Sequence, residues 1–106
     1  MAKFLWKASY SSDGLKGLLK EGGTGRRAAI EQLTEALGGK VEAFYYALGD
    51  DDVVVIVDLP DNTTAAAISL AVNSTGSVEL KTVPLLTVEE VDEAAKKSVD
   101  YRAPGA

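Results

Sequence analysis

Neither cysteine nor histidine occurs in this sequence of 106 residues. Without cysteine there is no disulfide framework, no thiolate nucleophile and no zinc ribbon. Without histidine there is no Ser-His-Asp triad, and haem iron or another metal finds no imidazole ligand. Acid–base chemistry near neutral pH would need an Asp, Glu, Lys or Tyr whose pKa is shifted. We therefore expect a domain that uses no metal and no cofactor.

Positive charge and long apolar runs are also scarce. The chain has 11 Lys plus Arg against 16 Asp plus Glu, for a net charge of −5. With no basic stripe to override that balance, we expect no nucleic-acid partner. No apolar run approaches the length of a membrane span, and the first residues lack the apolar core of a signal peptide. We expect a cytoplasmic protein with no membrane partner.

Apolar residues recur at strand spacing in some stretches of the chain and at helical spacing in others. Strands are predicted at residues 3–10, 41–48, 52–59 and 78–86. The first helix is interrupted by a glycine-rich stretch at 21–25 and ends at Gly38-Gly39. The second helix begins at Asp61 or Asn62 and ends at Gly76. Thr87 and Glu90 match a capping box that begins a short final helix.

This order predicts one α+β domain. A tight turn at residues 49–51 joins two neighbouring strands into a hairpin, and the other connections are long enough for helical crossovers. The pattern is typical of the ferredoxin-like βαββαβ fold with a four-stranded antiparallel sheet. We place the domain at residues 1–97 and expect residues 98–106 to form a flexible tail.

Both faces of the predicted sheet are apolar. In the third strand Val53, Val55 and Val57 point one way, and Val54 and Ile56 point the other. The second strand adds apolar residues to both faces, with Val41, Ala43, Tyr45 and Ala47 on one and Phe44, Tyr46 and Leu48 on the other. Because the two crossover helices cover one face only, we expect a second subunit to cover the other face. The alternative is that the final helix folds back over it.

A glycine-rich segment supplies the first candidate site. Thr24 is a candidate helix cap, which would place Arg26 and Arg27 in the first turn that follows. Free N–H groups at a helix start together with two guanidinium groups suit a carboxylate or phosphate. The alternative is structural pairing, with Arg27 facing Glu31 one turn later and either arginine facing an acid of a second subunit.

Aromatic residues supply the second candidate site. Trp6 and Tyr10 share one face of the first strand, and Tyr45 or Tyr46 is expected to join them from a neighbouring strand. Aromatic walls with a few polar tips are typical of small-molecule pockets. The alternative is that these rings simply pack the core, with their hydroxyl groups bonded to the backbone.

Other polar residues carry weaker signals. Asp50, Asp51 and Asp52 are better explained as a solvated turn than as a cation site, and Asp52 is a candidate acceptor that fixes the hairpin. Asn73 is either a polar pocket group or part of a helix end, and Lys81 fits the edge of the sheet.

Taken together, these stretches resemble the GYD-domain family, which is placed among the dimeric α+β barrels. The matching segments are residues 3–10, 17–23, 25–27, 37–39, 42–46, 52–61 and 87–90. The resemblance implies a ferredoxin-like fold and a dimeric α+β barrel assembly, and it implies no particular activity. In the turn at residues 49–52 the family usually has an aromatic residue where this chain has Asp51.

Two functions remain open from the sequence. The first is a homo-oligomeric binding, accessory or assembly module that takes a small anionic or aromatic ligand, with Trp6, Tyr10, Arg26, Arg27 and Tyr45 as candidate contacts. The second is a cofactor-independent enzyme, monooxygenase-like or isomerase-like by analogy with other barrels of this fold. In both, the first partner of the chain is a second copy of itself.

Overall fold

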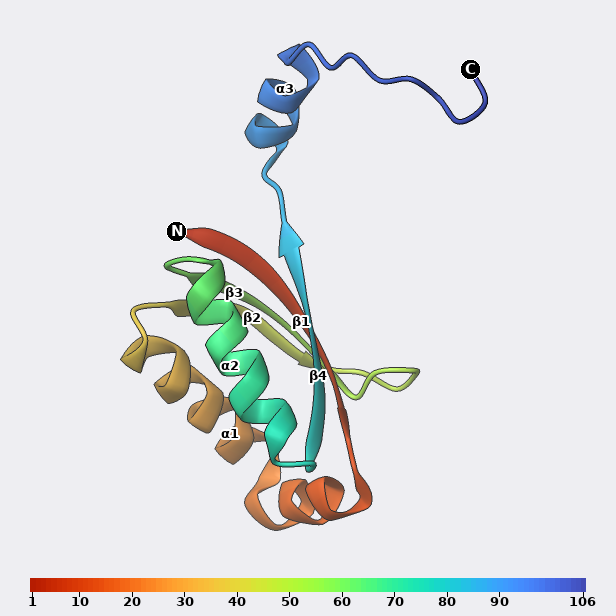
Figure 1. Ribbon diagram of the computed structural model, residues 1–106. Coiled ribbons are helices and arrows are strands. Elements are labelled where there is room, and N and C mark those ends of the chain that lie inside the picture. The colour runs from red at the N-terminus through yellow and green to blue at the C-terminus, as the bar shows by residue number, and fades with distance from the viewer.

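The computed structural model describes residues 1–106 and confirms the predicted order of elements. Strand β1 (Ala2–Tyr10), helix α1 (Ser12–Ala36), strands β2 (Lys40–Tyr46) and β3 (Val53–Leu59), helix α2 (Asn62–Ser74), strand β4 (Val78–Leu85) and helix α3 (Val88–Lys96) follow one another. The strands form one antiparallel sheet in the order β2-β3-β1-β4. This is the ferredoxin-like arrangement, with β1 and β3 at the centre (Figure 1).

Helices α1 and α2 lie on the same side of the sheet (Figure 1). The core between them and the sheet is built from alternate strand residues, among them Phe4, Trp6, Val57 and Leu59. Leu59 and Val57 are completely buried, and Phe4 is 2% exposed. We call this side the covered face of the sheet and the opposite side the open face.

Helix α1 changes direction at Gly22, as the glycine-rich stretch predicted. Gly22 alone leaves the helical conformation, with a φ of 80° that favours glycine. Figure 1 shows the two halves of α1 running in different directions. Thr24 lies inside the second half, so the prediction that it caps this helix is wrong. The second half of α1 therefore begins after Gly22, and no threonine side chain caps it.

The other local capping signals in the sequence are confirmed. Asp61 begins α2, where its Oδ1 accepts a hydrogen bond from the Thr64 amide at 2.8 Å. Thr87 and Glu90 form both halves of the capping box that begins α3. Gly38 and Gly76, which follow α1 and α2, have φ values of 83° and 74°. These short-range signals fix where each helix begins or ends.

The hairpin between β2 and β3 differs from the prediction in two respects. Strand β2 ends at Tyr46 and strand β3 begins at Val53, so residues 47–52 form a loop and not a tight turn. Leu48 is fully exposed in that loop and lies on neither face of the sheet. The backbone hydrogen bond from Ala47 N–H to the Asp52 carbonyl closes the loop at 2.8 Å. Asp52 also accepts from the Tyr10 amide at 2.8 Å, which ties the hairpin to β1.

A register shift between Val41 and Ala43 changes which face part of β2 presents. Val41 pairs with Val57 and packs against the core, on the same side as Phe44. The prediction that Val41 shares a face with Ala43 and Tyr45 is therefore wrong. An extra residue in one strand reverses the alternation beyond it.

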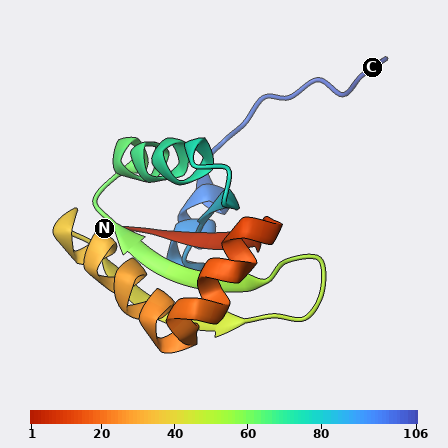
Figure 2. The same cartoon turned by 90° about the horizontal axis from the view of Figure 1, so that it is seen from below.

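Helix α3 lies beyond the end of β4, away from the two-layer body (Figure 1). None of its residues is buried, and Val88 and Val91 are 74% and 50% exposed. It does not fold back over the open face, which was the alternative to coverage by a second subunit. Residues 97–106 contain no helix or strand and lead away from the body (Figure 2). No helix of the chain combines the length and apolar character needed to cross a membrane.

Candidate functional site

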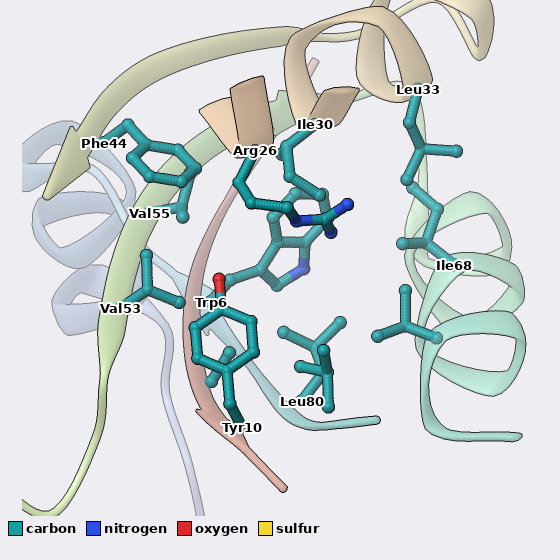
Figure 3. Close-up of a pocket in the computed structure, with 13 residues that line it drawn as sticks. Trp6, Tyr10, Arg26, Ile30, Leu33, Phe44, Val53, Val55, Ile68 and Leu80 are labelled. Atoms are coloured by element: carbon teal, nitrogen blue, oxygen red, sulfur yellow. The ribbon is translucent and has the colours of Figure 1, made fainter. Parts of the chain in front are cut away.

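A cavity lies between the covered face of the sheet and helices α1 and α2 (Figure 3). Its volume is about 60 Å³. Twelve of the 13 residues that line it are hydrophobic, and the exception is Arg26. We call this space the inner cavity; its lining is Trp6, Ala8, Tyr10, Arg26, Ile30, Leu33, Phe44, Val53, Val55, Ile68, Val72, Val78 and Leu80.

Strand β1 supplies Trp6 to the wall of this cavity. The alternation of the strand turns Trp6 and Tyr10 toward the helices, and Trp6 lies opposite Val55 of β3 and Thr82 of β4. The side chain of Trp6 is 97% buried, since only 3% of the residue is exposed. Figure 3 shows the indole among the lining residues, with its nitrogen facing the space between the strands and α2.

The indole nitrogen of Trp6 has no hydrogen-bond partner. A buried donor without an acceptor costs about 1–3 kcal/mol, and such groups are uncommon in folded proteins. Thr82, its neighbour on β4, also has a buried hydroxyl oxygen without a partner, although Thr82 lies outside the inner cavity. The indole N–H is thus a buried donor without an acceptor in a mostly apolar space.

Arg26 brings the only formal charge to the inner cavity. It comes from the second half of α1, and its side chain is 27% exposed. Its one acidic contact is Glu21, with 3.6 Å between Nη1 and Oε2, which is longer than a close charge-assisted hydrogen bond. Figure 3 shows the Arg26 side chain and the Tyr10 hydroxyl among the side chains that surround this space.

A more polar depression adjoins the inner cavity and shares Tyr10, Arg26, Val72 and Val78 with it. We call it the outer hollow; its other lining residues are Asp13, Gly14, Gly17, Leu18, Glu21, Thr75 and Ser77. Gly14 is required there because a Cβ atom would collide with the Ser77 carbonyl oxygen. Tyr10 and Arg26 therefore lie between the apolar inner cavity and the outer hollow, which contains the acidic residues Asp13 and Glu21.

The structure separates the five predicted site residues into two groups. Trp6, Tyr10 and Arg26 line the inner cavity. Arg27 and Tyr45 line a different depression, together with Gly23, Thr24, Phe44 and Tyr46. Arg27 approaches Glu31 at 3.9 Å, which is the structural pairing that was the alternative to a ligand contact. Two adjacent arginines thus point to two different places because successive helix residues lie about 100° apart.

Phe44 is the aromatic residue of β2 that joins Trp6 and Tyr10, so the expectation that Tyr45 or Tyr46 joins them is wrong. Tyr45 is 72% exposed on the open face, where it pairs with Val54. Tyr46 instead reaches α1, where its hydroxyl donates to the Gly23 carbonyl at 2.9 Å. Residues 43–46 are Ala-Phe-Tyr-Tyr, without a charged residue on either face, so the alternation alone could not reveal the register shift that precedes them.

Tyr46 has a pKa above the ordinary value for tyrosine. Burial is the largest cause that raises the pKa of Tyr46, and Tyr10 raises it further, while Arg26 and Arg27 oppose the shift. A raised pKa keeps this phenol protonated at neutral pH, so it donates a hydrogen bond there and does not act as a base.

The weaker polar candidates have structural partners. Asn73 bridges α2 to β4: its Oδ1 accepts from the Leu80 amide at 2.7 Å, and its Nδ2 donates to the Leu80 carbonyl at 3.1 Å. Asp51 contacts Lys7 at 3.9 Å. Lys81 is exposed on the edge strand β4, as predicted. No group of three or more acidic side chains converges as metal ligands do.

The open face carries an apolar row that crosses all four strands. Registered pairs place Ala43, Ile56, Leu5 and Val83 side by side. The row on one side of it contains Tyr45, Val54, Lys7 and Lys81. We call the first of these the apolar row and the second the lysine row. No helix of the chain lies over either one (Figure 1).

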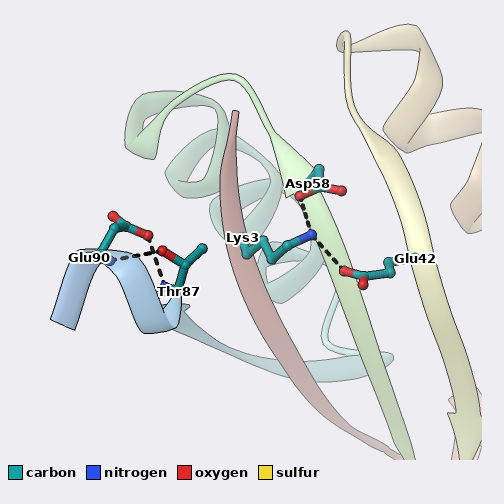
Figure 4. A network of polar contacts seen from close by, with 5 residues as sticks. All are labelled: Lys3, Glu42, Asp58, Thr87 and Glu90. Atoms are coloured by element: carbon teal, nitrogen blue, oxygen red, sulfur yellow. Dashed lines mark hydrogen bonds and ion pairs between the residues drawn. The ribbon is translucent and has the colours of Figure 1, made fainter. Parts of the chain in front are cut away.

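An ion-pair cluster borders the apolar row on its other side. Lys3 Nζ donates to Glu42 at 2.8 Å and to Asp58 at 2.9 Å (Figure 4). The hydrogen bond to Glu42, followed by that to Asp58, raises the pKa of Lys3 above its ordinary value. The open face therefore has an apolar centre between two differently charged borders.

Comparison with known proteins gives one match. The sequence model of one protein family, described as the GYD domain, matches residues 4–95. No curated protein and no solved structure matches the chain. The matched range takes in most of β1, all of β2, β3 and β4, helices α1 and α2, and most of α3.

Proposed function

The chain belongs to the GYD-domain family, and on that premise we propose that it is a small-ligand-binding module that assembles with itself through the open face of its sheet. The ligand site is the inner cavity, and the assembly is a homodimer or a larger homo-oligomer. In this proposal the two faces of one sheet have separate tasks.

One observation carries the ligand-binding part: an apolar cavity that holds a single charged side chain and a free indole N–H. Small-molecule sites are typically apolar, with a few polar groups that fix the orientation of the ligand. Packed cores, by contrast, leave few voids and rarely leave a buried donor without a partner. Trp6 and Arg26 therefore support a binding site more than they support simple packing.

The apolar row supports self-association. Val83 is 39% exposed at the edge of the sheet, and Leu5 and Ile56 are partly exposed on the central strands. Two copies related by a two-fold axis would bury their apolar rows against each other, because such an interface uses the same patch on both subunits. The lysine row and the Lys3 cluster would then flank the contact and limit the orientations in which it forms.

Native mass spectrometry of freshly purified protein at low activation tests both parts at once. We expect a multimer that retains a small extra mass per chain. A multimer of bare chains, also after incubation with a library of small acids and phenols, would contradict ligand binding and leave assembly standing. A monomer would contradict assembly.

The same experiment addresses the enzymatic alternative. A library compound that returns chemically altered would favour a cofactor-independent enzyme over a binding module. A cytoplasmic location stays a prediction, which fractionation of the producing cells would test.

A further inference from the structure

Two hydrogen-bond donors face the inner cavity without a close acceptor. The indole nitrogen of Trp6 has no partner, and the guanidinium of Arg26 has only the distant Glu21 contact at 3.6 Å. An indole N–H and a guanidinium donate and never accept. A molecule that satisfies both must therefore bring acceptor oxygens, and a negative charge suits the arginine.

The remaining wall restricts the rest of that molecule. Apart from Trp6, Tyr10 and Arg26 the lining residues are Ala, Val, Leu, Ile and Phe, so the part of the molecule that does not reach those three side chains should be apolar. The outer hollow adds Asp13 and Glu21, whose carboxylates disfavour a second negative charge on the approach side. A single acidic group on a short apolar body meets both conditions.

Cavity volume limits the length of that body. The inner cavity measures about 60 Å³, whereas an engineered apolar cavity of about 150 Å³ accommodates benzene. The space therefore suits a molecule of about two to four carbon atoms. A longer molecule would have to displace Arg26 or Tyr10, which separate the inner cavity from the outer hollow.

Building on the proposed function, we infer that the ligand is a short-chain monocarboxylate of about two to four carbon atoms. One carboxylate oxygen accepts from Arg26 and the other from the Trp6 indole N–H. The alkyl part contacts the aliphatic wall that includes Ile30, Ile68 and Leu80. Arg26 supplies the preference for an acid, the indole N–H orients its carboxylate, and the cavity volume supplies the preference for a short chain.

Trp6 makes this inference directly measurable, because it is the only tryptophan of the chain. We would titrate the protein with acetate, propionate, butyrate and octanoate at constant ionic strength, and record tryptophan fluorescence. Propionamide serves as the neutral counterpart of propionate. We expect a saturable change with propionate or butyrate, at least tenfold weaker binding of propionamide, and weaker binding of octanoate than of butyrate.

Adjacent arginines provide a matched pair of variants. Arg26→Gln should weaken propionate binding at least tenfold, whereas Arg27→Gln should leave it unchanged because Arg27 lies outside the inner cavity. Trp6→Phe removes the N–H and keeps a ring, and calorimetry should show binding weakened several-fold. Circular dichroism checks that each variant stays folded. Equal losses in the two arginine variants would overturn the assignment of Arg26.

The outcomes separate this inference from the proposed function. Equal binding of propionamide and propionate would overturn the carboxylate class and leave a ligand cavity in place. If neither the acids nor the amide bind, but native mass spectrometry shows a retained ligand of another kind, the inference is overturned and the proposed function stands. Failure of every acid and of the amide without any retained mass would overturn both.

Discussion

The two faces of the sheet use the same four strands for different purposes. The covered face packs aliphatic and aromatic side chains against α1 and α2, and it leaves a small cavity with a free indole N–H. The open face has no such cavity; its apolar row crosses the strands between two charged borders. An incomplete interior makes room for a ligand, whereas a continuous apolar row suits contact with another copy of the chain.

The largest expected effect compares two neighbours on β1 that point to opposite faces. Phe4 is buried in the core, and Leu5 belongs to the apolar row. Phe4→Ala should lower the free energy of unfolding by about 3–5 kcal/mol. Leu5→Ala should cost about 1 kcal/mol in dilute protein. Denaturant unfolding measures both values.

Protein concentration sharpens that comparison. If the open face becomes buried on assembly, the loss caused by Leu5→Ala should grow as the protein concentration rises, because self-association stabilises the folded state by mass action. The loss caused by Phe4→Ala should not change. Equal losses for the two variants in dilute protein would show that the faces are buried alike within one chain.

The second prediction concerns a substitution that disrupts the open face and leaves the covered face intact. Ile56→Lys places an ammonium group in the middle of the apolar row, so the dissociation constant of the assembly should rise about 100-fold, which corresponds to about 2.7 kcal/mol. Light scattering coupled to gel filtration measures the mass at several concentrations. Leu70→Lys is the control, because Leu70 is 73% exposed on α2. Unchanged assembly of Ile56→Lys would place the interface elsewhere.

The third prediction concerns the contact that attaches α2 to the edge of the covered face. Asn73→Ala removes both hydrogen bonds to the Leu80 backbone and should cost about 1–3 kcal/mol, because Leu80 N–H then loses its acceptor. Hydrogen exchange of the Leu80 amide should accelerate.

Ser74→Ala tests whether that effect is specific. The Ser74 hydroxyl donates only within its own helix, to the Ala71 carbonyl. Its removal should change stability by less than about 0.5 kcal/mol and leave the exchange of Leu80 unaffected. An equal loss in the two variants would mean that Asn73 acts through the helix and not through β4.

Local signals made much of the fold predictable from the sequence. Asp61, Gly76 and Thr87 act on neighbours within a few residues, so their roles as caps or helix ends could be read directly. The order of elements followed from apolar periodicity. These features depend on short stretches of chain, and therefore the sequence alone contains the information that fixes them.

The composition of the site was less predictable. The left-handed Gly22 resets the phase of α1, so the sequence does not say which of Arg26 and Arg27 turns toward the sheet. The register shift beyond Val41 similarly exchanges Phe44 for Tyr45 at the cavity wall. The final placement of both depends on packing between distant segments, and a single irregular residue in each element decides it.

The smallest expected effect is a pH dependence in the layer that covers the cavity. The backbone hydrogen bond from Thr64, followed by that from its hydroxyl, lowers the pKa of Asp61 below its ordinary value. The ionised cap therefore contributes its full stability above the ordinary aspartate pKa of about 3.9 and loses it as the pH falls through the lower folded-state value. Denaturant unfolding of the parent chain and of Asp61→Asn, from neutral to acidic pH, measures this difference.

The Asn variant keeps an acceptor oxygen at the cap without a charge, so any stability advantage of the parent chain should shrink below the ordinary aspartate pKa. A difference that stays constant across this range would show that the carboxylate charge contributes nothing at the start of α2. On the open face the sign is reversed: the raised pKa of Lys3 gives a contribution that is present below the ordinary lysine pKa and is lost at higher pH. Acid should thus weaken the covering layer first, and alkali the border of the open face.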